Sequence, residues 1–255
     1  MSLVKIYNLY PLIAGKISSW HEKIDYIKDL GFDTIYINPI FEMGYNKNLY
    51  APKNFLKFSQ DFLSSFDGDE EFKSFVDKCH EKGLKVIYEL IFTHTSIDSD
   101  LLTEHPEWYI NNNGALKKYS IKTENKWIEW GDLLELNNHS DKDSVKTNLW
   151  SYWHDITRNF INLGVDYIKI HSAFYLPQEP LKSLISSIKL EYPHMKFIGD
   201  NLGASFSDML DLSRIGVDYL FTSFKWWDFK SPWFFEQHYK LKDNVNLISF
   251  PESYD

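Results

Sequence analysis

Two ionisable side chains interrupt a short apolar stretch near the middle of the chain. The stretch is entered through Gly164, and its residues Lys169 and His171 alternate with isoleucines. Because side chains on a β-strand alternate between two faces, Lys169 and His171 should point to the same side. Burying a cation and an imidazole is costly unless that end of the strand opens on a polar site. The pattern predicts that this strand ends at an opening of the fold, called the mouth below, where polar side chains have a chemical function.

Carboxylates stand at matching places in neighbouring apolar stretches. Glu89 lies near the end of one apolar run, and Asp200 directly follows another. If these runs are strands of one parallel barrel, their C-terminal ends meet at the face where barrel enzymes carry their active sites. We therefore expect both carboxylates to share one pocket with Lys169 and His171.

A repeated glycine indicates where the strands begin. A glycine just past a helix, followed by a short apolar run, is typical of a helix end that leads into a buried strand. Such glycines occur in Leu30–Asp33, Lys82–Lys85, Leu163–Asp166 and Ile215–Asp218. With two weaker copies and the N-terminal run, the strands expected are Ile6–Leu9, Thr34–Asn38, Val86–Ile91, Tyr167–His171, Phe197–Gly199, Tyr219–Phe224 and Asn246–Phe250.

Amphipathic stretches between these runs predict helices. Apolar residues recur at helical spacing in Phe72–Cys79 and in Val145–Phe160, for example. Asp69 is the expected N-cap of the first of these helices, and Ser205 or Ser207 is that of a later short one. Alternating strands and helices imply a parallel sheet with right-handed crossovers.

Seven such units in a chain of this length favour an α/β fold of the (β/α) TIM-barrel type over an open doubly wound sheet. No Gly-rich dinucleotide loop is present. The single barrel domain, residues 1–255, should be incomplete, because the chain stops at Asp255, where the seventh strand should finish. The interval from Phe92 to about Lys142 is polar and aromatic, without a strand–helix unit. Residues 95–142 are therefore expected to form a subdomain inserted after the third strand, over the mouth.

The composition is that of an ordinary globular protein with an acidic balance. The 255 residues are 44% hydrophobic and 25% charged, with a formal net charge of -9. That charge argues against a nucleic-acid partner. The start of the chain lacks the apolar core of a signal peptide, and no run reaches transmembrane length. We expect a cytoplasmic protein without membrane contact, and the single cysteine fits a reducing compartment. The oligomeric state is left open.

Three segments resemble a known family. The runs Glu104–Tyr109, with its His-Pro-Glu-Trp core, Asp132–Asn137 and Tyr219–Trp226 are similar to segments of the α-amylase superfamily of glycoside hydrolases and transglycosylases. Within it, the nearest likeness is to the maltosyltransferases that use maltose 1-phosphate. The resemblance covers nearly the whole chain and implies a (β/α) barrel with an insertion after the third strand. The last barrel unit and the C-terminal β domain of that family would be absent.

The departures from this family fall on its chemistry. The resemblance implies a carboxylate nucleophile at the end of the fourth strand and an arginine two residues earlier, where this chain has His171 and Lys169. It implies a glutamate acid/base at the fifth strand, where Asp200 stands, and an Asn-His-Asp end to the seventh, of which only Asp255 remains. His171 cannot supply the carboxylate that retaining chemistry needs. We expect the family mechanism to be lost.

The third strand departs in part. Glu89 replaces the aspartate of the family, His94 matches its histidine, and Thr93 replaces an asparagine that often helps to bind calcium. Tyr50 is similar to the tyrosine that stacks on the reacting sugar. We expect no cofactor and no metal, since His94 and His139 lack the ligand spacing of a zinc site.

The favoured hypothesis is a degenerate domain that binds, or formerly processed, α-glucan such as a maltooligosaccharide. Aromatic residues reach 17%, and rings stack on the apolar faces of sugars. The substrate-binding candidates are Tyr50, His94, Lys169, His171 and Tyr254.

Two alternatives stay open, so the sequence does not decide whether the protein is an enzyme. One is an active hydrolase or glycosyltransferase with rewired chemistry, for example inverting hydrolysis by Asp200 with Asp255 or Glu89. Inversion needs the two carboxyl groups about 6.5–9.5 Å apart. The other is a structural or interaction protein on a barrel scaffold. In that case Glu89 is a paired structural carboxylate, and His171 fills the mouth as the partner of Glu89 or Asp200.

Overall fold

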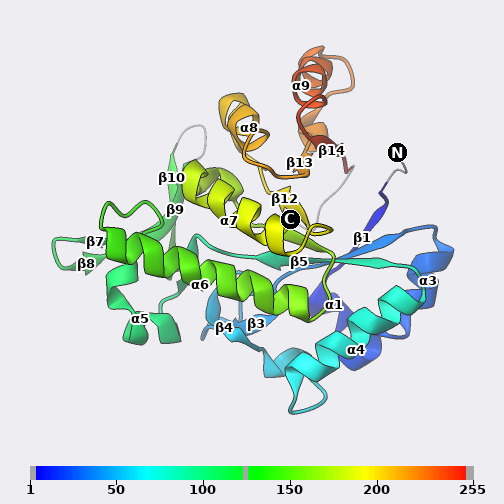
Figure 1. Ribbon diagram of the computed structural model, residues 1–255, viewed down its shortest axis with the longest axis horizontal. Coiled ribbons are helices and arrows are strands. Elements are labelled where there is room, and N and C mark those ends of the chain that lie inside the picture. The colour runs from blue at the N-terminus through cyan, green and yellow to red at the C-terminus, as the bar shows by residue number, and fades with distance from the viewer. Residues whose placement is uncertain (1–3, 123–125, 251–255) are drawn as a thin grey trace.

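The computed structural model describes residues 4–122 and 126–250. Its centre is a curled sheet of seven parallel strands in the order β1-β2-β5-β11-β12-β13-β14 (Figure 1). The strands are Ile6–Leu9 (β1), Thr34–Ile37 (β2), Lys85–Leu90 (β5), Tyr167–Ile170 (β11), Lys196–Gly199 (β12), Tyr219–Phe221 (β13) and Asn246–Ile248 (β14). The predicted strands and their parallel pairing are confirmed, although β13 and β14 end earlier than expected.

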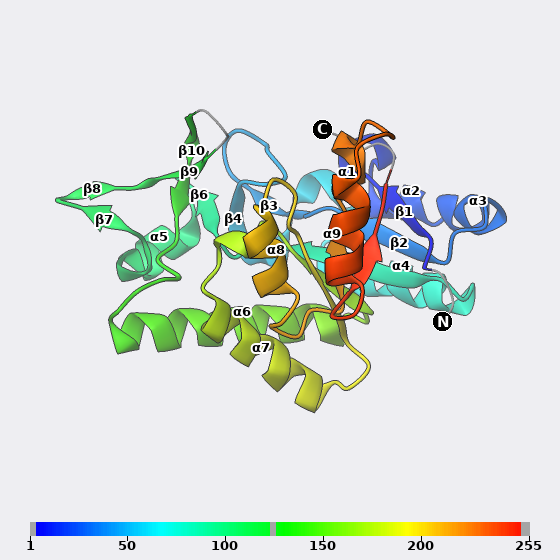
Figure 2. The same cartoon turned by 90° about the horizontal axis from the view of Figure 1, so that it is seen from above.

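Helices separate successive strands of this sheet. They are Pro11–Ala14 (α1), Ile17–Trp20 (α2), Lys23–Asp29 (α3), Gly68–Glu81 (α4), Asp143–Asn162 (α6), Gln178–Glu191 (α7), Phe206–Leu212 (α8) and Trp233–Leu241 (α9). Helices α6 and α7 pack against each other (Figure 2). The result is the predicted incomplete (β/α) barrel, with β1 and β14 at the two edges of the sheet. In the described part of the chain, no helix is both long and apolar enough to cross a membrane.

Alternate residues of a strand face either the helices or the barrel interior. On β5, Tyr88 packs in the large core shared with the helices, where its ring stacks on Phe160 of α6 at 4.1 Å. Its neighbour Ile87 belongs to a separate cluster with Tyr36 of β2 and Ile198 of β12. The alternation read from the sequence therefore separates the helix-facing core from the barrel interior.

Aspartates in the glycine-containing turns tie neighbouring strands together at the N-terminal end of the sheet. Each carboxylate accepts a backbone N–H from near the start of the adjacent strand. The pairs are Lys5 to Asp33, Val86 to Asp166 and Phe197 to Asp218, each at 2.9 Å. The repeat that marks the strand starts thus also supplies hydrogen bonds that hold the strands in register.

One helix cap differs from its prediction. Asp67, not Asp69, is the N-cap of α4, and its carboxylate accepts the N–H of Glu70 at 3.0 Å. Asp67 has the extended backbone of a cap, whereas Asp69 already lies in the first turn. Ser205, one of the two serines proposed, caps α8 in a capping box with Asp208.

Two groups of elements lie outside the repeating units. After β2 comes the antiparallel pair Phe41–Met43 (β3) and Pro52–Phe58 (β4), which the sequence did not predict. Between β5 and α6 lie His94–Ser96 (β6), Asp100–Glu104 (α5), Asn111–Asn112 (β7), Ala115–Leu116 (β8), Lys118–Lys122 (β9) and Trp127–Glu135 (β10). Strands β6, β10 and β9 form a small antiparallel sheet at the end of the molecule away from α3 (Figure 1). Short 3-10 helices occupy Gln60–Phe62, Pro106–Trp108, Ala173–Tyr175 and Phe224–Trp226.

Candidate functional site

A lysine lies between two carboxylates at the C-terminal ends of β5, β11 and β12. Glu89 and Lys169 are partners in register on β5 and β11, and Asp200 follows β12. Lys169 Nζ donates to Glu89 Oε1 and, at 2.8 Å, to Asp200 Oδ2. Glu89 is completely buried, and Lys169 and Asp200 are nearly so. Because the ammonium contacts both carboxylates, it offsets part of their negative charge where little water reaches them.

The Glu89 carboxylate accepts hydrogen bonds from four side chains. Lys169 and, at 3.1 Å, His171 Nδ1 bind Oε1. The hydroxyls of Tyr36 and, at 3.0 Å, Tyr50 bind Oε2. Burial by itself raises the pKa of Glu89, but the Lys169 charge and the bonds from His171 and Lys169 lower that pKa to about 2. All the acceptor positions of this ionised carboxylate are in use, which leaves none for a substrate.

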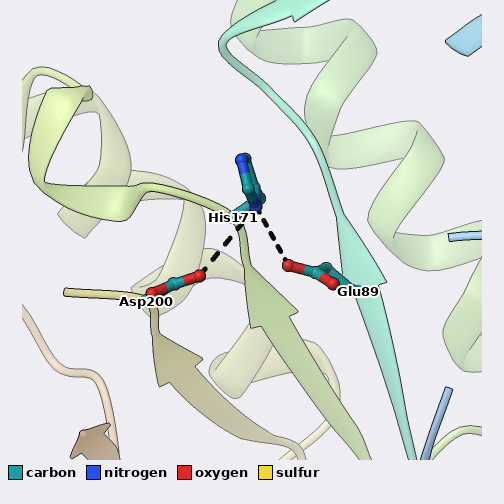
Figure 3. Close-up of side chains that lie close together, drawn as sticks. All are labelled: Glu89, His171 and Asp200. Atoms are coloured by element: carbon teal, nitrogen blue, oxygen red, sulfur yellow. Dashed lines mark hydrogen bonds and ion pairs between the residues drawn. The ribbon is translucent and has the colours of Figure 1, made fainter. Parts of the chain in front are cut away.

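His171 presents one ring nitrogen to the carboxylates and the other to the mouth. Nδ1 lies 3.1 Å from Glu89 Oε1 and 3.9 Å from Asp200 Oδ2. Figure 3 shows the second ring nitrogen pointing away from both acids. The side chain is 21% exposed, and within residues 4–122 and 126–250 its Nε2 has no hydrogen-bond partner. Because Glu89 is ionised, Nδ1 must carry the proton of the shared bond, so Nε2 keeps its lone pair when the ring is neutral.

His94, predicted to bind substrate, has both ring nitrogens bonded to protein. Nε2 lies 2.8 Å from the backbone oxygen of Tyr50, and Nδ1 lies 2.8 Å from the Thr93 hydroxyl. Burial, and then the nearby His171, lower the pKa of His94 to about 3, so the ring is neutral. Because a carbonyl only accepts, Nε2 carries the proton and Nδ1 accepts from Thr93.

Asp200 is less occupied than Glu89. Its Oδ1 accepts the backbone N–H of Leu202 at 3.1 Å, and its Oδ2 accepts from Lys169. With respect to the described residues, each oxygen therefore keeps one lone pair that a ligand could use. The other candidates, Tyr254 and Asp255, lie outside the described residues.

Sequence reasoning missed a polar network that braces the tyrosines. Asn38 Nδ2 lies 3.0 Å from the hydroxyl of Tyr36 and 2.9 Å from that of Tyr50. Asn8 Nδ2 in turn donates to Asn38 Oδ1 at 2.7 Å. Tyr36 and Asn38 are two residues apart in an apolar run, the same alternation that revealed Lys169 and His171. That signal could have found them.

Tyr119, on β9 of the inserted segment, reaches the cluster from outside the barrel. Its ring centroid lies 4.1 Å from that of His94. Its hydroxyl is buried without a hydrogen bond of good geometry, although Ser172 and Thr93 lie near it. Burial raises the pKa of Tyr119 to about 12, which keeps the hydroxyl protonated. No sequence signal points to this contact, because β9 shares no repeat with the barrel strands.

The same side chains form the one candidate metal-ligand group in the described part of the chain. Glu89, His171 and Asp200 place one ligand atom each within 4.8 Å of one another. The Lys169 ammonium already contacts both carboxylates, and a metal ion would have to displace it against charge repulsion. The donor set suits an internal lysine better than a metal ion.

A hollow of about 770 Å³ lies apart from this cluster. Its walls come from β3, β4 and the loop before α4, and they include Leu56, Phe58 and Phe66. None of the candidate site residues lines it. The described candidate site residues are therefore gathered at the strand ends and not in this hollow.

Comparison with known proteins decides the family. The family model "Alpha amylase, catalytic domain" matches residues 11–170, well over half of the chain. The chain belongs to the α-amylase family. It is thereby related to glycoside hydrolases and glycosyltransferases, and the resemblance expected from the sequence is confirmed. The match ends one residue before His171.

Individual relatives of this α-amylase-family chain are distant. The maltose-1-phosphate maltosyltransferase of Burkholderia pseudomallei is 20% identical over 248 residues, which cover 95% of this chain and 21% of that protein. The corresponding Myxococcus xanthus enzyme is 25% identical over 224 residues, 81% of this chain and 32% of its own length. An amylopullulanase of Thermoanaerobacterium saccharolyticum is 34% identical over 231 residues, 77% of this chain and 17% of that protein. The chain thus spans a third or less of the length of these relatives.

Solved structures share the fold. An α-amylase of Lactobacillus plantarum superposes with a TM-score of 0.75 and 21% identity, covering 96% of this chain and 61% of that one. A maltogenic α-amylase of Thermotoga neapolitana gives a TM-score of 0.77 and 16% identity, covering 99% and 60%. At these identities the likeness establishes the barrel alone.

Proposed function

We propose that the chain is a degenerate α-amylase-family domain that binds α-glucan or maltooligosaccharide at the barrel mouth without the retaining reaction of the family. The observation that carries the proposal is the saturated Glu89 carboxylate. It is fully buried, it is joined to Asp200 through Lys169, and its four donors leave it no acceptor position. A retaining enzyme needs a free carboxylate nucleophile, and the neighbouring His171 does not provide one.

The carboxylate spacing also speaks against an inverting pair made by Glu89 and Asp200. Their nearest ligand atoms lie within 4.8 Å, whereas inversion leaves about 6.5–9.5 Å for a water molecule. Lys169 fills the space between them. A rewired inverting enzyme would therefore need Asp200 and Asp255 as its carboxyl pair. Activity measurements decide whether this pair catalyses hydrolysis.

Sugar binding is supported by what faces the mouth. Tyr50 lies beside His171, with the ring centroids 5.0 Å apart, and both side chains are partly exposed. Rings of this kind stack on the apolar faces of sugars, while neighbouring polar atoms bond the hydroxyls. The maltosyltransferases among the relatives are named for an α-1,4-glucan and maltose 1-phosphate, and we extend the glucan to this chain.

We further propose that residues 1–255 act as one barrel domain and that residues 95–142 form a subdomain over its mouth. The contact between the Tyr119 ring of β9 and the His94 ring supports a position over the mouth. It brings the inserted segment close to the charged side chains at the strand ends. Such a cover would add sugar contacts that the strand ends alone lack.

The test is purified protein with maltose through maltoheptaose and with maltose 1-phosphate. Calorimetry measures binding, and NMR of the anomeric protons identifies any product. We expect saturable binding of the longer sugars and no turnover. Retention of configuration well above background, abolished by His171→Ala, would overturn the proposal. Inversion abolished by Asp200→Asn would favour the rewired enzyme.

A further inference from the structure

The Glu89–His171 pair has the geometry of an oriented base. A buried, ionised carboxylate receives Nδ1–H of the imidazole at 3.1 Å, and the opposite ring nitrogen faces outward (Figure 3). In acid–base catalysts the same arrangement fixes the tautomer and aims a lone pair at the reacting group. The His171 side chain is 21% exposed and its Nε2 has no partner among the described residues, so a ligand at the mouth can reach that nitrogen.

We propose that His171 Nε2 accepts the hydrogen bond of a sugar hydroxyl at the mouth and that Glu89 is the residue that positions it. This inference rests on the proposed sugar-binding function and adds the atom that recognises the ligand. The ligand group must be a donor, because the exposed lone pair can only accept when the ring is neutral.

The charges around His171 favour a neutral hydroxyl over an anionic group. In the described part of the chain, the charged side chains that face it are Glu89 from β5, Lys169 from β11 and Asp200 after β12, and the Tyr50 ring lies beside it. Two carboxylates and one ammonium leave an excess of one negative charge, which repels a phosphate or carboxylate. The neutral His94, 6.0 Å away between ring centroids, does not alter this balance.

The position of Nε2 depends on Glu89 and not on the strand alone. His171 directly follows β11, and Ser172 after it adopts a left-handed backbone with φ 47° and ψ 44°. The chain turns at Ser172, so the strand does not continue past His171 to hold its ring. The contacts that hold the ring are the Tyr50 ring and the hydrogen bond to Glu89. Loss of that bond should release the ring.

The tautomer of His171 is the first test, and it needs no ligand. Protein labelled with ¹⁵N at histidine is measured by NMR at neutral pH, with His94 as the internal reference. We expect the Nδ1–H form for His171 and the Nε2–H form for His94. Glu89→Gln should mix the forms of His171 while His94 keeps its own. An Nε2–H form of His171 in the unmodified protein would overturn the proposal.

The second test separates the two roles of the ring. In His171→Asn, the amide can replace Nδ1–H toward Glu89 but offers nothing at Nε2. We therefore expect an unchanged melting temperature and about fivefold weaker binding of maltotriose, the loss of one ordinary hydrogen bond. His171→Gln, whose amide oxygen can reach the Nε2 position, should recover part of the affinity. His154→Asn, on α6 with its ring against Ser187, is the matched control.

The outcomes distinguish this inference from the proposed function. If the wild type binds no maltooligosaccharide, the proposed function fails, and so does the proposal that a sugar hydroxyl donates to His171 Nε2. If the wild type binds but His171→Asn binds equally well, only the role of His171 is refuted. Binding weakened in His171→Asn and unchanged in His154→Asn supports both.

Discussion

His94 and His171 lie with their ring centroids 6.0 Å apart, and their hydrogen-bond partners require opposite tautomers. The Tyr50 carbonyl selects Nε2–H in His94, while the Glu89 carboxylate selects Nδ1–H in His171. Both nitrogens of the His94 ring are bonded to protein, and the Nε2 of His171 has no hydrogen-bond partner among the described residues. His94 is thus held by protein groups through both ring nitrogens, whereas His171 is bonded to Glu89 through Nδ1 only.

The buried His94 should make folding stability depend on pH. Its pKa is lowered from 6.5 to about 3 in the folded protein, so the unfolded chain binds the proton more readily. Stability is then full above pH 6.5 and falls as the pH drops toward the folded value. Between pH 6.5 and about pH 5 the loss should reach about 2 kcal/mol. Urea unfolding of the wild type and His94→Gln at both pH values measures it.

The control for that experiment is His154→Gln, which should keep the full pH dependence because His154 lies partly exposed between α6 and α7. If the free energy of unfolding changed equally between the two pH values in wild type and His94→Gln, His94 would not be held neutral in the folded protein.

Removal of Lys169 should be far more damaging than removal of a surface lysine. Lys169→Met leaves Glu89 and Asp200 buried beside each other without their shared cation, at a cost of about 3–5 kcal/mol. Lys85→Met, which breaks an ion pair of a 58% exposed lysine with Asp166, should cost about 1 kcal/mol or less. Chemical denaturation at neutral pH compares the two. Similar losses of unfolding free energy in the two variants would contradict the role of Lys169 as the shared cation of buried Glu89 and Asp200.

Among the described residues, the buried Tyr119 hydroxyl has no hydrogen bond of good geometry, so its removal should not weaken the fold. Tyr119→Phe is expected to leave stability unchanged or raise it by about 1 kcal/mol. Tyr109→Phe in the same inserted segment loses a 2.9 Å bond to Thr95 and should cost about 1 kcal/mol. Thermal melts of the pair settle the comparison. A clear loss of stability in Tyr119→Phe would mean that the hydroxyl has a partner in the folded protein.

The turn aspartates should act on the fold and leave the mouth untouched. Asp166 accepts the Val86 backbone N–H and also contacts Lys85 and His80. Asp166→Ala is expected to cost about 2 kcal/mol, because a backbone donor near the start of β5 loses its partner. Asp61→Ala, in an exposed pair with Lys47, should cost less than about 1 kcal/mol. Maltooligosaccharide affinity should be the same in both variants, measured by calorimetry below their melting temperatures.

Restoring the family carboxylate alone should not restore chemistry. His171→Asp would place a third acid beside Glu89 and Asp200 with only Lys169 to balance them, so the new group would be driven toward its neutral form. We expect no retaining turnover of maltooligosaccharides and a lower stability than wild type, since catalytic groups act as a unit. Product analysis by NMR checks this. Measurable retention in the single variant would show that His171 was the one obstacle.

The sequence by itself determined the layout of the barrel and the meeting of the polar side chains. Period-two alternation put Lys169 and His171 on one face, and parallel strands brought Glu89 and Asp200 to the same end. Both follow from local rules, because burial leaves its period in the sequence of each strand. The same alternation places Tyr36 and Asn38 on one face of β2, but the sequence analysis did not identify Tyr36 as a partner of Glu89.

Only the tertiary structure decided which lone pairs remain free. The four donors on Glu89 come from β2, β11, the residue after β11 and the β3–β4 segment. Alternation indicates that Lys169 and His171 face Glu89, but it does not show which oxygen each donor binds or that Tyr50 joins them. Tyr119 comes from β9, which shares no repeat with the barrel strands. Asp67 and not Asp69 caps α4, because its backbone is extended and its carboxylate accepts the Glu70 N–H. Residue type gives the chemistry that a side chain can perform. Which of its atoms can reach a ligand depends on neighbours that are distant in sequence, and those are placed only when the chain folds.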